Sequence, residues 1–247
     1  SIKFNVPVTK SDSSLAKYSA REAISFGWAS LPIACLAINS SLAFKFMQGN
    51  QMKGHYFEFG SFGARTFRLA WDHSRAYLNN APHLINEIHL FAFDSFQGFP
   101  KSNLNEDKHK KFPEGLASMS KDDFINTLVD YGIDMEKVTI TSGFYKDSLN
   151  DNLKNNLLNK GYKNNAGVVY FDCDLYSSTT EALEFISPFL QNGSVLCFDD
   201  YYCYEGSKEK GQQLAINHWL KSNQDFYLHP YENFGWHGKI FIFNRKF

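Results

Sequence analysis

The stretch VVYFDCD, residues 168–174, is a short apolar run that ends in two carboxylates. Such a run is typical of a strand that is buried on both faces, as in a parallel sheet. The stretch VLCFDD, residues 195–200, repeats the same design further along the chain. Amphipathic segments separate these and other apolar runs, and this alternation predicts a parallel sheet with crossover helices.

The same pattern extends in both directions from this stretch. Strands are expected at residues 56–59, 88–93, 138–141, 168–171 and 195–198, with helices at 65–79, 121–131, 148–159, 179–190 and 207–221. Asn192-Gly193 is expected to end the fourth helix before the strand at 195. Segments 226–231 and 239–243 flank a turn and predict a hairpin. The fold class is therefore α/β and Rossmann-like, with a mostly parallel seven-stranded sheet, an antiparallel C-terminal hairpin and helices on both faces.

The N-terminal part follows a different pattern. Residues 1–53 are expected to form a helical extension, in which Ser13-Ser14 caps a helix through Phe26 and Pro32 starts or kinks a second helix. Residues 54–247 then form a single globular domain. The Lys-rich stretch 100–118 has no clear period and is expected to be a long surface loop that acts as a lid.

Composition excludes several classes of protein. Lys and Arg number 25 and Asp and Glu 26, so no basic excess indicates a nucleic-acid partner. The four cysteines form no CxxC pair, which argues against zinc and favours free thiols in a reducing, cytoplasmic setting. The start of the chain shows no signal pattern. The apolar stretch 24–46 carries polar residues throughout, so we expect packed helices and no membrane association there.

Ligands of open α/β sheets bind beyond the carboxyl ends of the strands, so the residues there matter most. Glu58 and a glycine-containing turn, EFGSFG at 58–63, follow the first strand, and Asp94 follows the second. One carboxylate at the second position can accept from both hydroxyls of a ribose. Gly143-Phe144 follows the third strand and offers an adenine a flat apolar wall. The alternatives are simple turn chemistry for the glycine-containing turn, a helix cap or a turn residue for Asp94, and core packing for Phe144.

Carboxylates crowd the ends of the last two parallel strands. Asp172 and Asp174 follow one strand, and Asp199 and Asp200 follow the other. Four acids at neighbouring strand ends repel one another, and desolvation adds to the cost. A hard divalent cation, such as Mg²⁺, Mn²⁺ or Ca²⁺, resolves this conflict. The alternative is that one or two of the acids cap helices and the others are exposed.

Four motifs resemble those of the macrocin/mycinamicin O-methyltransferase family. The most specific is FDSFQGFP, residues 93–100, which is close to the family's FDSFxGLP. DCDLYSST at 172–179 is similar to DxDLYxST, and GSVLCFDDY at 193–201 is similar to GGxxxxDDY, with Ser194 in place of the second glycine. GFYKDSL at 143–149 is similar to GWFxDTL. The resemblance runs from about residue 55 to the C-terminus, and the predicted hairpin suits class I methyltransferases.

The resemblance implies an S-adenosylmethionine-dependent enzyme that uses a divalent metal, expected to be Mg²⁺, to methylate a sugar hydroxyl of a small molecule. The implied cofactor-binding residues are Glu58, Gly60 and Ser61 at the methionine end, Asp94 and Ser95 at the ribose, and Gly143 and Phe144 at the adenine. The implied metal ligands are Asp172, Asp199 and Asp200, whereas Asp174 is expected to cap the following helix. Arg65 departs from the family, which has a small residue there, and leaves the start of the local helix open. A homodimer is expected by analogy.

Methyl transfer from a sulfonium is an in-line displacement, so the protein positions the acceptor and helps to deprotonate it. Asp172 is the expected catalytic proton acceptor, and His237 and His109 are the other candidate bases. The main alternative is a nucleotide-sugar glycosyltransferase that holds a metal through Asp172-Cys173-Asp174. That alternative gives Glu58 and Gly60 no role.

Overall fold

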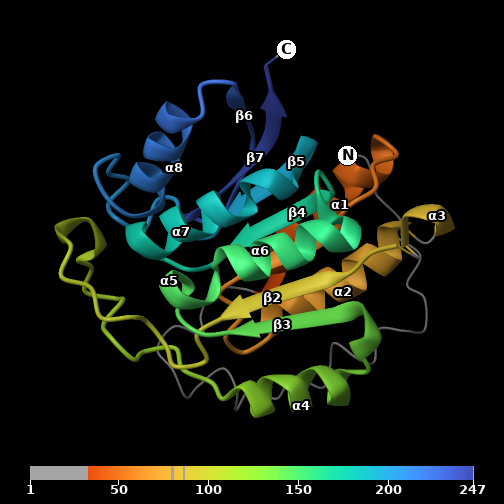
Figure 1. Cartoon of the computed structure of the whole chain (residues 1–247), viewed down its shortest axis with the longest axis horizontal. Helices are drawn as coiled ribbons and strands as arrows, with labels where there is room; N and C mark the ends of the chain where they lie inside the picture. The colour runs from red at the N-terminus through yellow and green to blue at the C-terminus, as the bar shows by residue number, and fades with distance from the viewer. Residues whose placement is uncertain (1–32, 79–80, 86, 247) are drawn as a thin grey trace, which may run out of the picture.

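The computed structural model describes residues 33–78, 81–85 and 87–246. One sheet, with the strand order β3-β2-β1-β4-β5-β7-β6, lies between two layers of helices (Figure 1). The strands are β1 His55–Phe59, β2 Leu90–Asp94, β3 Val138–Ser142, β4 Ala166–Phe171, β5 Leu190–Phe198, β6 Phe226–Phe234 and β7 Gly238–Arg245. The helices are α1 Ile33–Gly49, α2 Arg65–Leu78, α3 Pro82–Ile85, α4 Lys121–Tyr131, α5 Tyr145–Ser148, α6 Asp151–Leu157, α7 Tyr176–Ile186 and α8 Gly211–Ser222.

Strands β1 to β5 are parallel, and the hairpin β6–β7 joins the edge of β5 antiparallel to it. This arrangement confirms the predicted fold class. It also places the carboxyl ends of the five parallel strands at one edge of the sheet, where this class of fold binds its ligands.

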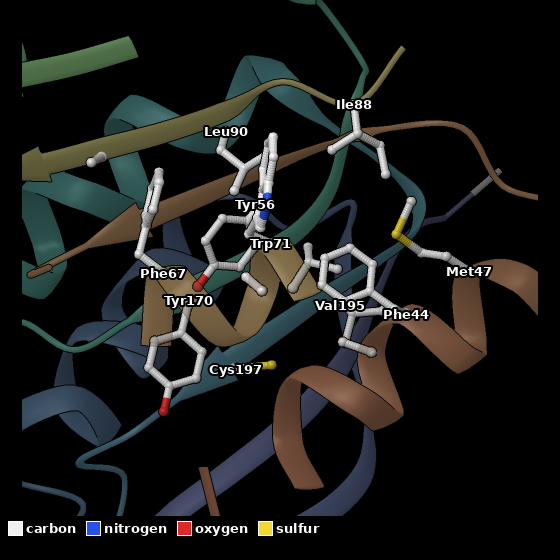
Figure 2. Packing of buried hydrophobic residues seen from close by; sticks show 14 of the residues in the cluster. Phe44, Met47, Tyr56, Phe67, Trp71, Ile88, Leu90, Tyr170, Val195 and Cys197 are labelled. Carbon is white, nitrogen blue, oxygen red and sulfur yellow. The ribbon is translucent and has the colours of Figure 1, made fainter. Parts of the chain in front are cut away.

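Alternate residues of the strands bury two separate faces, as the period of a strand requires. On one face, Tyr56 and Val195 pack with Phe44 and Met47 of α1 and Trp71 of α2 (Figure 2). The opposite face packs under α6, α7 and α8 and is rich in phenylalanine. The abundant phenylalanine of the sequence therefore serves largely as core.

Two predicted boundaries were wrong near Pro188. Helix α7 ends at Ile186 and not at 190, because proline lacks the N–H that would continue an α-helix. Strand β5 starts at Leu190, so Asn192-Gly193 lies inside the strand and not before it. Gly193 has φ +90° at a shift in the β4–β5 register, and the glycine accommodates this irregularity.

Helix α1 is the described part of the predicted N-terminal extension. It packs against α2, and Phe44 and Met47 belong to the same core as the sheet. The helix predicted at 13–26 lies outside the described residues, and the domain boundary at 53/54 stays a prediction. Within residues 33–78, 81–85 and 87–246, no helix has both the length and the apolar character needed to cross a membrane.

Candidate functional site at the carboxyl edge of the sheet

A row of phenylalanine rings fixes the strand ends that carry the predicted site. Phe93, Phe59, Phe171 and Phe198 are register partners on four neighbouring strands. Their ring centroids are 4.8, 5.4 and 4.5 Å apart in that order. The residue that follows each of these phenylalanines is a predicted site residue, namely Asp94, Gly60, Asp172 and Asp199. The sheet therefore presents these positions on a rigid, apolar base.

Gly60 is required by the sheet itself. It has φ +88°, and a β-carbon there would lie 2.7 Å from the carbonyl carbon of Asp172 and nearer to its oxygen. The glycine thus lets the ends of β1 and β4 meet closely. Its role in approaching a cofactor, which the sequence predicts, is not tested by this contact.

Glu58 and Ser61 present buried polar atoms that lack partners. Glu58 is fully buried, and Tyr56 donates its hydroxyl hydrogen to one carboxylate oxygen. Burial raises the pKa of Glu58 to about 8. The other oxygen, Oε1, and the hydroxyl of Ser61 form no hydrogen bond of good geometry, although the Ser61 and Thr66 side chains lie near enough to Glu58 to oppose the rise in its pKa. Buried polar atoms are normally satisfied, so both atoms fit a ligand's donor group, such as an ammonium.

Asp94 holds the glycine turn in place. Its Oδ2 accepts the backbone N–H groups of Ser61 and Phe62 at 2.8 and 3.0 Å, and its Oδ1 accepts that of Phe96 at 2.7 Å. A carboxylate has about four acceptor positions, so one lone pair of Oδ1 is not used by these three bonds. Asp94 therefore stabilises the turn, which is the alternative role that the sequence also allows. The predicted ribose contact stays a prediction.

Ser95 and Gly143 form hydrogen bonds within the protein that stabilise the ends of β2 and β3. The hydroxyl of Ser95 donates to the Gly98 carbonyl at 2.8 Å. Gly143 has φ +131°, and its N–H bonds the Asp94 carbonyl, which joins the ends of β2 and β3. Tyr145 is core, whereas Phe144 is half-buried beside it. Phe144 thus remains the aromatic ring available for a planar ligand at this edge.

Three carboxylates come together at the ends of β4 and β5. One oxygen each of Asp172, Asp174 and Asp200 lies within 4.8 Å of the others. Asp174 and Asp200 are buried, and Asp172 is partly exposed. Burial, and then repulsion from the neighbouring carboxylates, raises the pKa of Asp172 and Asp174 well above the usual value and that of Asp200 to about 7. Asp200 Oδ2 accepts from no ordinary donor, although Asp174 and Asp200 can share a hydrogen bond when one of the two acids is protonated.

This group fits a hard divalent cation. The donor atoms are all carboxylate oxygens, the type of ligand that Mg²⁺, Mn²⁺ and Ca²⁺ prefer. A cation would also relieve the repulsion that raises the pKa of each acid. The sequence counted Asp174 among the four crowded acids, but the family resemblance did not make it a metal ligand. Its predicted role as a helix cap was wrong, because the residue at the N-cap of α7 is Leu175 and no side chain caps the helix from there.

Asp199, the third ligand that the sequence predicts, lies beside the group. Its Oδ1 accepts the hydroxyl hydrogen of Tyr170, and its Oδ2 is 3.5 Å from Nδ1 of His237. His237 is 2 % exposed, its Nδ1 lies 2.6 Å from the Asp199 carbonyl oxygen, and its Nε2 is unpartnered. Of the two candidate bases, His237 therefore contacts the acidic edge directly. Whether Asp199 binds a metal stays a prediction.

The loop at 100–118 is anchored to α7. Asp107 accepts the N–H of Ser177 at 3.0 Å and its hydroxyl at 2.7 Å, and so caps the helix that Asp174 was expected to cap. Phe112 packs with Leu175 and Tyr204 in a small separate cluster. Figure 1 shows the loop beyond the tip of β2, at the edge of the sheet that carries the site. The loop thus occupies the position expected of a lid.

A cavity of about 510 Å³ lies within this loop, lined by Lys101, Lys108, Lys110 and Leu175 among others. It includes none of the strand-end residues predicted to act. We therefore define the candidate site by the strand ends.

Sequence reasoning missed a buried glutamine that joins the two acidic strand ends. Gln212, at the start of α8, accepts the N–H of Asp200 at 3.0 Å and donates to the Phe171 carbonyl at 3.1 Å. It is fully buried. Cys203 donates its thiol hydrogen to Asp200 Oδ1 at 3.2 Å. Neither residue belongs to a motif, and only the three-dimensional contact identifies them.

Comparison with known proteins agrees with this architecture. The O-methyltransferase NovP has 19% sequence identity and a TM-score of 0.65, over 85% of this chain and 79% of that one. The O-methyltransferase TomG from Streptomyces achromogenes, solved in complex with SAM, has 11% identity and a TM-score of 0.52, over 84% and 79%. The chain therefore has the class I fold of these O-methyltransferases.

The family follows from the sequence match. The model of the macrocin-O-methyltransferase (TylF) family matches residues 52–224, and the chain belongs to this family. A curated relative from Streptomyces olivaceus, 8-demethyl-8-(2,3-dimethoxy-alpha-L-rhamnosyl)-tetracenomycin-C 4'-O-methyltransferase, is 29% identical over 117 residues. That match covers 45% of this chain and 41% of the relative, so the two are similar over about two fifths of the relative's length. This membership favours methyl transfer over the glycosyltransferase alternative.

Proposed function

We propose that this protein is an S-adenosylmethionine-dependent, divalent-metal-dependent O-methyltransferase that acts on a sugar hydroxyl of a glycosylated small molecule. The observation that carries the proposal is the group of three carboxylates at the ends of β4 and β5, in a chain of this methyltransferase family. The similar curated enzyme methylates a rhamnosyl sugar, which supports the choice of acceptor.

The methyl donor would lie along the ends of β1, β2 and β3. Glu58 Oε1 and Ser61 Oγ are buried and unpartnered, and they suit the ammonium of the methionine moiety. Asp94 would hold the ribose with the lone pair that its three backbone donors leave, and Ser95 lies beside it. Gly143 and Phe144 would border the adenine. In this arrangement the methionine end of the donor, at β1, would lie next to β4, whose end carries Asp172.

Asp172 and Asp200 would hold the cation, together with Asp174 or the predicted ligand Asp199. A divalent cation there, expected to be Mg²⁺, supplies positive charge that makes a nearby hydroxyl more acidic. Asp172 is the most exposed of the three clustered acids, so its carboxylate is the one that an acceptor can reach. In this proposal Asp172 accepts the proton of the acceptor hydroxyl, and Asp174 and Asp200 stay buried.

The other parts of the site position these groups. Gln212 holds the main chain of Asp200 against that of Phe171, and Tyr170 holds Asp199. The loop capped onto α7 by Asp107 excludes water from the edge.

The test measures transfer of tritium from [methyl-³H]S-adenosylmethionine to a rhamnosylated aromatic polyketide. We expect transfer by the wild type with Mg²⁺, and loss of about 100-fold or more in Asp172→Asn, with binding of S-adenosylhomocysteine retained. Asp151→Asn, which changes an exposed acid on α6, is the matched control. Full transfer by Asp172→Asn, or in excess chelator, would contradict the roles assigned to the acid and the cation.

A further inference from the structure

An exposed tryptophan stands beside the acidic edge. Trp236, in the turn between β6 and β7, is 57% exposed, the largest value among the exposed large hydrophobic side chains of the described residues. A single exposed hydrophobic residue is ordinary in itself. The position of this ring relative to the site is what suggests a function.

The turn is tied to the end of β5. Gly235 has φ +54°, and His237, two residues further on, turns inward and places its Nδ1 2.6 Å from the Asp199 carbonyl oxygen. The His237 carbonyl in turn accepts the N–H of Tyr202 at 2.8 Å. These contacts fix the backbone on one side of Trp236. The indole therefore projects from a rigid turn whose next residue contacts an acid of the site.

The lid loop reaches the same ring from the other side. Lys111 Nζ lies 4.9 Å from the centroid of the Trp236 ring. The neighbouring Phe112 is buried against Tyr204, and Asp107 fastens the loop to α7. Segments 125 positions apart in sequence thus meet at Trp236, the residue before His237, which contacts Asp199 at the end of β5.

We propose, on the basis of the proposed function, that Trp236 is the platform on which the pyranose ring of the acceptor stacks. The electron-rich face of an indole attracts the polarised C–H groups on the apolar face of a sugar. The Lys111 ammonium, which lies near the ring, can donate to hydroxyls of a sugar bound there. A pyranose held this way has a hydroxyl-bearing rim directed at the acidic edge. Trp236 is then a specificity-determining residue, which the reaction needs for orientation.

Saturation-transfer NMR with methyl α-L-rhamnopyranoside, in the presence of S-adenosylhomocysteine, tests this inference. We expect transfer to the ring C–H protons in the wild type, at least a fivefold loss in Trp236→Ala, and retention in Trp236→Phe. Tyr227→Ala is the matched control. Tyr227 is 47% exposed on the same hairpin, about 24 Å from the turn at the strand's rise per residue.

Equal transfer in Trp236→Ala and Tyr227→Ala would overturn the inference, as would no transfer in the wild type with the nucleoside bound. Calorimetry of S-adenosylhomocysteine binding keeps the two proposals apart. Failure to bind the nucleoside refutes the proposed function. Normal nucleoside binding, with a sugar signal that does not depend on Trp236, refutes the stacking platform alone.

Discussion

A Gly60→Ala substitution would place a β-carbon 2.7 Å from the carbonyl carbon of Asp172. No change of side-chain rotamer can relieve this contact. The contact is with backbone, so the ends of β1 and β4 must separate. The left-handed φ of +88° adds about 1–2 kcal/mol of strain, and overpacking adds about 1–3 kcal/mol. We therefore expect a loss of about 2–5 kcal/mol in the free energy of unfolding.

Gly63→Ala is the matched control. It changes the other glycine of the same turn, and nothing lies within 4 Å of a β-carbon built there. A domain of this size loses about 2–4 °C in Tm for each kcal/mol, so Gly60→Ala should melt roughly 5–20 °C below the wild type. Gly63→Ala should melt within about 2 °C of it.

Ligand binding provides a second measure of the same substitution. Separation of β1 from β4 moves Ser61 relative to Asp172, so we expect calorimetry to show at least a tenfold weaker affinity of Gly60→Ala for S-adenosylhomocysteine. Wild-type melting and affinity in Gly60→Ala would show that the strand ends are not in the close contact described above, and would refute the reasoning.

Three further predictions concern stability and the lid. Burial lowers the pKa of His55 from 6.5 to about 4, so the folded state keeps the imidazole neutral and the unfolded state takes up the proton first. About 3 kcal/mol of stability, present above pH 6.5, should be lost as the pH falls from 6.5 to 4. In urea titrations at several pH values, His55→Gln should weaken the dependence of the free energy of unfolding on pH. An unchanged dependence would show that other groups cause it. Asp107→Ala removes the cap of α7 and should lower stability by about 1–2 kcal/mol and speed proteolysis of the lid loop, with Glu114→Ala as the control. Equal cleavage of these two variants would count against the anchoring role. Gln212→Leu keeps the volume but leaves the Asp200 N–H unpaired, and should cost about 1–3 kcal/mol in chemical denaturation; wild-type stability would show that this bond is dispensable.

The sequence predicted the sheet well because its strands are short apolar runs buried on both faces. Runs of this kind were interpreted as buried strands, and β1 to β5 each overlap the expected segment. Helix α2 begins at Arg65 as the period predicts, although this residue departs from the family pattern. The fourth helix was overextended because an apolar period continued through Pro188, whose missing N–H outweighs the pattern.

The site was predicted less completely, because its contacts join distant residues. A motif placed Asp94 at the right strand end, but it did not show that three backbone donors occupy its oxygens. Asp174 was taken for a helix cap because it precedes a helix, whereas Asp107, 70 positions from Ser177, supplies the cap. Local spacing identifies which acids stand at strand ends, but only the fold decides which of them meet.

The central claim is that carboxylates at the ends of β4 and β5 hold a divalent cation beside the methyl donor. Titration of Mn²⁺, followed by the loss of its free electron paramagnetic resonance signal in the presence of S-adenosylhomocysteine, tests this claim most directly. We predict that the wild type binds one equivalent of Mn²⁺ and that Asp200→Asn, which removes the charge of this buried carboxylate, binds none. A wild type that leaves all Mn²⁺ free, or an Asp200→Asn variant that binds it equally well, would contradict the account.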